Sequence, residues 1–341
     1  MASQNEAAGI LQPKNEFLDL TRSSEKKNPY VFLVGCPRSG TTMLKRMVNA
    51  HPLVAITRET HWIPRFYEKQ RGVTAEGNIT PRLVDKLFEH HRFEQMKFKR
   101  EKLQSLLDRN PEINYSKLVS QIFDHYGERK NKPIVGDKTP NYVRKIPVLH
   151  KLWPSARFVH LIRDGREVWL SIKNWRMAEK SAGQFSTWQS DPLVTTALWW
   201  KALVGMGRRD GAKLDESLYQ EVQYQNLVIH PEQSCKQLSN FLNLPYADSM
   251  DRYYEGRTQF DNQLSTNAAW LPPTPGRRNW QKEMTGEEIE RFEAAAGDLL
   301  EEIGFARTCP CIRRQVQSEV DALKAEFAAD VDDRWSLPQP W

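Results

Sequence analysis

The segment Gly35-Cys-Pro-Arg-Ser-Gly-Thr-Thr carries the clearest chemical signal in this sequence. It follows an apolar run, residues 30–34, and precedes a helical pattern of apolar residues that starts at Met43. A strand, a tight glycine turn and a helix start form a cradle for phosphate, because backbone N–H groups and the helix dipole converge on the anion. We therefore expect residues 35–42 to bind a phosphate-type group.

This loop departs from the loop of ordinary nucleotide hydrolases. Gly35 and Gly40 have the spacing of a Walker A loop, but Thr41 stands where that loop has a lysine. The nearest fixed cation is Arg38, inside the loop. The departure favours a phosphate-like ligand in a reaction other than ordinary nucleotide hydrolysis.

Further polar residues follow other predicted strands. Glu59, Lys138 and Arg163 each come shortly after an apolar run. Ligands of open parallel sheets lie beyond the carboxyl ends of the strands, so we expect these side chains to meet the loop in one cleft. Arg38, Lys138 and Arg163 would then hold anions, and Glu59 would be available as a base.

The elements that must position these residues alternate along the chain. Apolar runs predict strands at residues 30–34, 53–56, 134–136, 157–162 and 217–222. Periodic patterns predict helices at residues 81–108, 114–129, 165–180, 193–209, 231–242, 285–303 and 312–330, with a capping box at Thr285 and Glu288. This alternation indicates an α/β protein with a parallel, doubly wound sheet.

Composition limits the class of protein. The chain has 341 residues, a net charge of +6 and a sequence pI near 9.0. A basic cleft for a polyanion explains this charge, and nucleic-acid binding is disfavoured because no helix–turn–helix, zinc or RNA-recognition signature occurs. No apolar run reaches the length of a membrane span, the first residues lack a secretory signal, and the four cysteines suit a reducing compartment, so we expect a cytoplasmic location.

The chain divides into three predicted parts. Residues 1–28 are polar and predict a flexible arm, residues 29–308 predict the main domain, and residues 309–341 predict a helical tail. The tail either packs on the body or mediates self-association as a homodimer, and the sequence leaves both open.

Several of these motifs together resemble a known family. Residues 35–42 resemble the 5′-phosphosulfate loop of sulfotransferases that use 3′-phosphoadenosine 5′-phosphosulfate (PAPS). Arg163-Asp-Gly-Arg, with Ser171 eight residues after Arg163, resembles the 3′-phosphate site of that family. Tyr224-Gln-Asn-Leu-Val-Ile-His-Pro resembles its segment near the adenine. The motifs keep the family order from about residue 30 to residue 305.

Other segments are most similar to the tyrosylprotein sulfotransferases and their bacterial relatives. These are Ala50-His-Pro, Glu59-Thr-His-Trp-Ile-Pro-Arg and Asp137-Lys-Thr-Pro. The branch that sulfates protein tyrosine is normally membrane-anchored in the secretory pathway, and no anchor is predicted here. The resemblance is therefore to the catalytic core of that branch, and it implies a P-loop NTPase-like three-layer α/β fold with a central mostly parallel sheet and inserted helices.

The resemblance implies a role for each matching residue. Glu59 corresponds to the base that takes the acceptor proton, and Lys138 to the lysine that stabilises the leaving oxygen. No metal is expected. The implied nucleotide-binding residues are Arg38, Ser39, Gly40, Thr41, Thr42, Arg163, Ser171, Tyr224 and Arg278.

Some positions depart from the family pattern. A family lysine before the C-terminal tryptophan is replaced by Asn279, and Arg278 or a neighbouring cation is the candidate substitute. Trp175 stands where the family has an arginine. Participation of Ser265, in a poorly aligned loop, and of His61 stays open.

The sequence thus predicts a sulfotransferase that moves a sulfuryl group from PAPS to a hydroxyl of a small molecule, lipid or carbohydrate and releases 3′-phosphoadenosine 5′-phosphate (PAP). Three alternatives remain: protein-tyrosine sulfation, a non-catalytic nucleotide-binding protein, and a P-loop kinase that uses ATP and magnesium.

Overall fold

The computed structural model of this protein describes residues 29–255 and 271–336, which are centred on a parallel sheet. Within these residues the sheet has five strands in the order β2-β3-β1-β4-β5, and each pair runs parallel. The strands are β1 (Val31–Gly35), β2 (Val54–Thr57), β3 (Ile134–Lys138), β4 (Arg157–Ile162) and β5 (Tyr219–Gln223). All of β1 is buried, as expected for a central strand covered on both faces.

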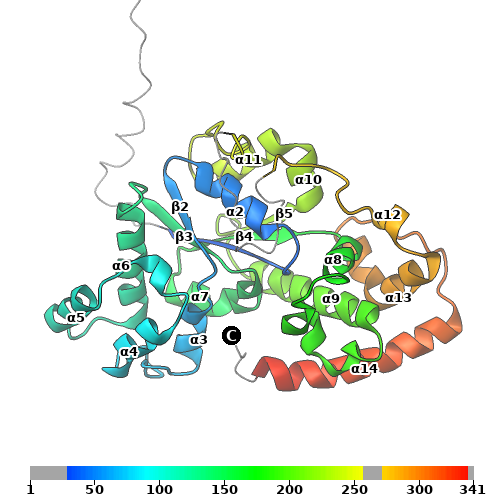
Figure 1. Cartoon of the computed structure of the whole chain (residues 1–341), viewed down its shortest axis with the longest axis horizontal. Coiled ribbons are helices and arrows are strands. Elements are labelled where there is room, and N and C mark those ends of the chain that lie inside the picture. Colours follow the sequence, from blue (N-terminus) through cyan, green and yellow to red (C-terminus); the bar gives the residue numbers. More distant parts are fainter. Residues whose placement is uncertain (1–28, 256–270, 337–341) are drawn as a thin grey trace, which may run out of the picture.

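Helices cover both faces of the sheet and give three layers (Figure 1). One face packs Leu33 and Leu161 against α2 (Thr41–Ala50), α10 (Tyr224–Ile229) and α11 (Pro231–Phe241). The opposite face packs Phe32 and Phe158 against α6 (Tyr115–Glu128), α7 (Ile146–Leu152), α8 (Gly165–Ile172), α9 (Pro192–Gly211) and α13 (Gly286–Glu302). The predicted P-loop NTPase-like α/β fold is confirmed, and the sheet is parallel throughout.

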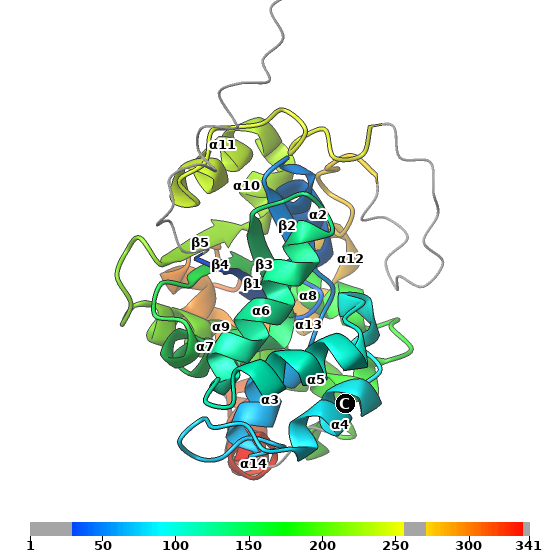
Figure 2. The same cartoon turned by 90° about the vertical axis from the view of Figure 1, so that its left-hand side faces the viewer.

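Between β2 and β3 the chain forms the helical insert, residues 62–133, which Figure 2 shows from its outer side. It contains α3 (Trp62–Glu68), α4 (Arg82–Glu89), a short 3₁₀ turn η1 (Glu94–Met96), α5 (Arg100–Arg109) and α6. The prediction of one helix over residues 81–108 is wrong. Met96 and Phe98 are both buried although they are two residues apart, and Lys97 between them has φ 49°, so a continuous helix cannot present both to the core.

Most other boundaries agree with the sequence within a few residues. The observed β4 coincides with its predicted range, and the capping box of α13 is present, with Thr285 Oγ1 accepting from the Glu288 N–H at 3.1 Å. The helix expected over residues 165–180 ends at Ile172. Short 3₁₀ turns follow: η3 (Ala178–Lys180), η4 (Ala182–Gln184) and η5 (Ser186–Trp188).

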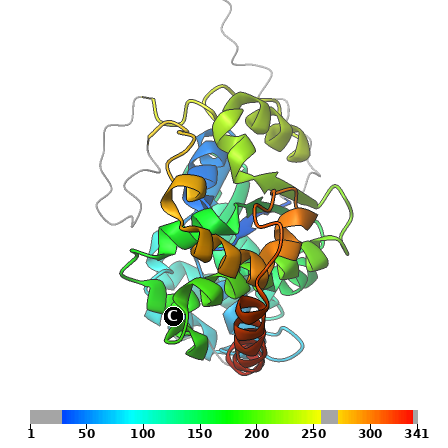
Figure 3. The same ribbon diagram turned by 90° about the vertical axis from the view of Figure 1, so that its right-hand side faces the viewer.

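The C-terminal helix α14 (Arg314–Ser336) packs on the body along α9, α13 and η5 (Figure 3). Val316, Val320 and Phe327 on this helix are buried. The ring of Phe327 lies 4.5 Å from that of Phe185, measured between centroids. Packing on the body is thus one use of the predicted tail.

A buried arginine fastens the segment between α13 and α14 to α8. Arg166 donates two hydrogen bonds to the carboxylate of Asp164, at 2.7 and 3.0 Å, and one to Glu293 at 3.0 Å. Its guanidinium lies 3.6 Å from the ring centroid of Trp280, at the start of α12 (Trp280–Glu283). Glu293 also accepts from the backbone N–H of Thr308 at 3.0 Å. The second arginine of the Arg163-Asp-Gly-Arg motif is therefore structural.

We predict that Glu293→Ala lowers the free energy of unfolding by about 3 kcal/mol, since it removes one partner from a buried, charged arginine and from buried N–H groups. Urea denaturation measures this change. The control is Glu301→Ala, because Glu301 is exposed and its ion pair with Arg307 is long, 3.8 Å. Equal losses in the two variants would contradict the structural role of the buried network.

Candidate functional site

The loop between β1 and α2 has the geometry of an anion cradle. Gly40 begins α2 with φ 95°, a conformation that favours glycine. A Cβ atom at this position would lie 2.6 Å from the ring of Tyr224, so the loop backbone packs directly on that ring. Thr41 and Thr42 form the first turn of α2, where N–H groups lack intrahelical partners. Ser39 is fully buried and its N–H closes the turn by donating to the Cys36 carbonyl at 3.2 Å.

Two arginines from separate motifs meet beside this loop. Arg163, which follows β4, donates to the backbone carbonyl of Arg38 at 3.4 Å, and its guanidinium lies 4.3 Å from the ring centroid of Tyr224. Arg38 Nε donates to Ser171 Oγ at 3.1 Å. The guanidinium of Arg38 also lies over the ring of Trp175, at 4.7 Å. Trp175, which stands where the family has an arginine, thus contacts Arg38 of the loop.

The charges of this region suit a ligand that carries several negative charges. Burial lowers the pKa of Arg38, and the positive charges of Arg163 and Arg278 lower it further. Arg278, the candidate substitute for the missing family lysine, therefore lies within electrostatic range of the loop. Glu167 pairs with Arg163 at 2.7 Å, and the excess of positive charge in this partly buried site still favours an anion. These residues fit a nucleotide with more than one phosphate.

A close ion pair joins the ends of β2 and β3 next to the loop. Lys138 Nζ lies 2.7 Å from Glu59 Oε1 and donates to Thr42 Oγ1 at 3.5 Å. Lys138 is the last residue of β3 and is 6% exposed. A single ammonium thus bridges the predicted base and the predicted anion loop.

A second group holds Glu59 from the other side. His61 Nε2 lies 3.1 Å from Glu59 Oε2, and His61 has φ 57°, an uncommon backbone conformation that occurs often at functional sites. Burial alone would raise the pKa of Glu59, but Lys138 and His61 outweigh it and hold that pKa well below its usual range. Glu59 is consequently a charged carboxylate while Lys138 contacts it.

Buried polar groups brace the strands that carry this pair. Asp137 is fully buried; burial raises its pKa, and hydrogen bonds from neighbouring threonines oppose that rise. Thr57 Oγ1 donates to Asp137 Oδ2 at 2.7 Å, which joins the end of β2 to β3. The Thr60 N–H donates to Thr139 Oγ1 at 3.0 Å. These contacts fix the distance between Glu59 and Lys138.

Two residues near the site were missed in the sequence. Burial and the like charges of Lys138 and Arg58 lower the pKa of Lys45 to about 7. Lys45 lies four residues after Thr41 on α2, so helical spacing was a usable signal. Arg92 donates to the backbone carbonyl of Glu59 at 3.2 Å. It comes from the helical insert, and no local pattern connects it with Glu59.

The predicted site residues fall within the described part of the chain, except that Ser265 lies outside it. The loop residues, Glu59 and Lys138 are in direct or near contact, and Ser171, Arg163 and Tyr224 adjoin the same loop. Their individual roles stay predictions. Among residues 29–255 and 271–336, no three His, Cys, Asp or Glu side chains are grouped as ligands for a metal ion.

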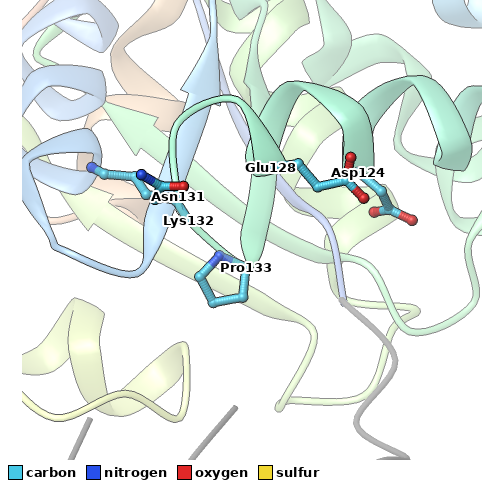
Figure 4. Close-up of a pocket in the computed structure, with 5 residues that line it drawn as sticks. All are labelled: Asp124, Glu128, Asn131, Lys132 and Pro133. Atoms are coloured by element: carbon cyan, nitrogen blue, oxygen red, sulfur yellow. The ribbon is translucent and has the colours of Figure 1, made fainter. Parts of the chain in front are cut away.

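A separate pocket lies away from these residues (Figure 4). Its volume is about 610 Å³, and it is lined by Asp124, Glu128, Asn131, Lys132 and Pro133. These residues precede β3, whereas Glu59, Lys138 and the loop lie at the carboxyl ends of the strands. The pocket therefore lies at the amino-terminal end of β3, and the predicted site lies at the carboxyl ends of the strands.

Comparison with known proteins assigns the class. The model of the sulfotransferase family matches residues 29–248, more than half of the chain, and the chain belongs to this family.

The individual proteins to which the chain is similar share less than a third of its residues. The chain is 27% identical over 230 residues to protein-tyrosine sulfotransferase 1 of Danio rerio, a match that covers 67% of this chain and 57% of that protein. It is also similar to the sulfotransferase domain of the curacin biosynthetic pathway, with 19% identity, a TM-score of 0.49 and coverage of 86% and 96% of the two chains. A mouse sulfotransferase complexed with PAP has 12% identity, a TM-score of 0.45 and coverage of 88% and 89%. The chain thus spans little more than half the length of the curated relative.

These relatives contradict the predicted cytoplasmic location. The curated matches are protein-tyrosine sulfotransferases, members of the branch that acts in the secretory pathway. Among the helices of the described residues, none is both long and apolar enough to cross a membrane.

The position of Lys45 predicts a pH dependence of anion binding. Its pKa near 7 means that Lys45 gains a positive charge as the pH falls from 8 to 6, so Lys45 should contribute a rise in PAP affinity over this interval, while protonation of the PAP phosphates acts against it. Calorimetric titration of PAP at several pH values measures the effect. In Lys45→Met the rise should be smaller. An unchanged pH dependence in this variant would rule out the contribution of Lys45.

Proposed function

We propose that this protein transfers the sulfuryl group of PAPS to an acceptor hydroxyl and releases PAP. The contact of Lys138 with both Glu59, at 2.7 Å, and Thr42, at 3.5 Å, carries this proposal. It joins a cation that can stabilise a leaving oxygen, a carboxylate that can accept a proton, and an anion loop in one place. Membership of the sulfotransferase family supports the same reaction.

Binding of the donor is assigned to two groups of residues. The N–H groups of the loop, the Thr41 and Thr42 hydroxyls and Arg38 hold the phosphosulfate. Arg163 and Ser171 hold the 3′-phosphate, with Tyr224 and Arg278 beside them. The mutual approach of Arg38 and Arg163, and the cationic environment that lowers the pKa of Arg38, support this division.

The chemical step uses Glu59 and Lys138 together. Glu59 accepts the proton of the acceptor hydroxyl, the acceptor oxygen bonds to sulfur, and the bond from sulfur to the phosphate oxygen breaks. Lys138 stabilises the negative charge that develops on that phosphate oxygen, as electrostatic groups do in phosphoryl transfer. As Lys138 turns from Glu59 toward this oxygen, Glu59 loses a positive neighbour and becomes more basic.

The acceptor has two candidate classes. One is a hydroxyl of a small molecule, lipid or carbohydrate. The other is the phenol of a protein tyrosine, and the names of the curated relatives favour it. Transfer of labelled sulfate from PAPS to a tyrosine peptide, a simple phenol, a sugar and a sterol distinguishes them. Parallel assays with ATP and magnesium test the kinase alternative, and tight PAP binding without any transfer would favour a non-catalytic binding protein.

Glu59→Gln should lower the rate of sulfate transfer by about 10² to 10⁴-fold, because the amide cannot accept the proton. Its affinity for PAP should not fall, since Glu59 contacts Lys138 and not the loop backbone, and its loss leaves Lys138 available to an anion in the loop. Equilibrium binding and steady-state rates measure the two effects. Glu68→Gln on α3, whose carboxylate contacts Lys145, is the matched control. A parallel loss of PAP affinity in Glu59→Gln would refute the assignment of the base.

Arg163→Ala should weaken PAP binding by about 1.5–3 kcal/mol, the usual contribution of a charge-assisted hydrogen bond. Adenosine 5′-phosphate lacks the 3′-phosphate, so its affinity should change much less. Calorimetric titration with both nucleotides measures the difference, and Arg208→Ala on the surface of α9 serves as control. If both nucleotides lose affinity equally, Arg163 does not bind the 3′-phosphate.

A further inference from the structure

The segment that carries Glu59 lacks the support of a regular element. Residues 58–61 connect β2 to α3 without helix or strand hydrogen bonding, and His61 within it has a positive φ. A carboxylate that accepts a proton must be held close to its productive position. The contacts that fix this segment therefore bear directly on the reaction.

A ring of hydrogen bonds ties this segment to the helical insert. Arg92 Nη1 donates to the backbone carbonyl of Glu59 at 3.2 Å and lies 3.8 Å from Glu59 Oε2. The N–H of Arg58 donates to Gln95 Oε1 at 2.8 Å, and Gln95 Nε2 donates to the carbonyl of Arg92 at 2.9 Å. Arg92 and Gln95 thus hold the two successive residues, Arg58 and Glu59, from the same side.

The insert is itself anchored where it makes these contacts. Phe93 and Met96, which flank Gln95, are buried, and the ring of Phe93 lies 5.7 Å from that of Trp62 in an edge-on arrangement. Trp62 is the first residue of α3, directly after the segment of Glu59. Buried side chains therefore fix both segments that the ring of hydrogen bonds joins, the one around Gln95 and the one around Glu59.

The groups that act on Glu59 come from several elements. Lys138 contacts it from β3 and His61 from its own segment, while Lys45 on α2 and Arg38 in the loop act through their charges. Arg92 is the cation that the insert contributes.

We propose that Arg92 is a positioning residue for Glu59. It holds the backbone of Glu59 in place and keeps a positive charge beside Oε2 of the Glu59 carboxylate. The role in catalysis rests on the proposed function, whereas the effect on the Glu59 carboxylate does not. No covalent step is added.

The test combines the titration of Glu59 with kinetics. The ¹³C NMR signal of the Glu59 carboxylate, identified by its loss in Glu59→Gln, is followed against pH in the wild-type chain and in Arg92→Ala, Arg92→Gln and Arg92→Lys. PAP is present at saturation, because contact with Lys138 holds the pKa of Glu59 well below its usual range in the chain without nucleotide. Removal of the positive charge should raise the pKa of Glu59 in the Ala and Gln variants, and Lys should preserve it. Arg100→Ala, in the same insert but paired with exposed Asp85, is the matched control and should leave the signal unchanged.

In the transfer assay, Arg92→Ala should lower kcat by about tenfold to a hundredfold, with PAP affinity unchanged and the acidic limb of the pH profile moved to higher pH. Arg92→Gln, which keeps a donor for the backbone carbonyl, should recover part of kcat at high pH. Arg92→Lys should keep the wild-type position of that limb.

The outcomes separate the two hypotheses. An unaltered titration of Glu59 in folded Arg92→Ala overturns the positioning role, and so does an unaltered kcat. If the Ala variant does not fold, the Gln variant decides by the same readings. If the wild-type chain transfers no sulfate to any acceptor while the titration of Glu59 still shifts, the proposed function fails and the contact of Arg92 with the carboxylate stands.

Discussion

The parallel pairing of β1 with β3 on one side and with β4 on the other is the constraint on which the site depends. In this arrangement the loop after β1 lies between Lys138 at the end of β3 and Arg163 after β4. One cation therefore approaches the loop from each side. β2, which pairs with β3, brings Glu59 to the side of Lys138. Sheet order alone thus places Arg163 on one side of the loop, and Lys138 with Glu59 on the other.

Opposite charges meet where Glu59 contacts Lys138, with His61 on the other side of the carboxylate. A carboxylate in contact with an ammonium and an imidazole is stabilised as an anion and is a weak base. The same ammonium contacts Thr42 of the loop, so an anion bound there competes with Glu59 for it. In the proposed reaction, donor binding and strengthening of the base are in this way linked through a single side chain.

Much of this arrangement could be predicted from local patterns in the sequence. The apolar runs predict the strands, and because the carboxyl ends of parallel strands meet, the sequence also predicts that Glu59, Lys138 and Arg163 lie at the same end of the sheet. The interruption at Lys97 and the contact of Arg92 with Glu59 could not be predicted. Both depend on how the insert folds onto β2, a tertiary effect with no periodic signal. The division of Arg163-Asp-Gly-Arg into one site arginine and one structural arginine also required the position of Glu293 on a distant helix.

The buried network of Arg166 has a consequence for how the molecule opens. Arg163 lies between β4 and α8, three residues before Arg166 in the first turn of α8. Arg166 is bonded to Glu293, which in turn holds the backbone of Thr308 and Cys309. Local opening of the chain between α13 and α14 exposes this charge, so it cannot proceed without disturbing the first turn of α8. We therefore expect the segment between α13 and α14 to open together with the first turn of α8, beside the arginine next to the loop.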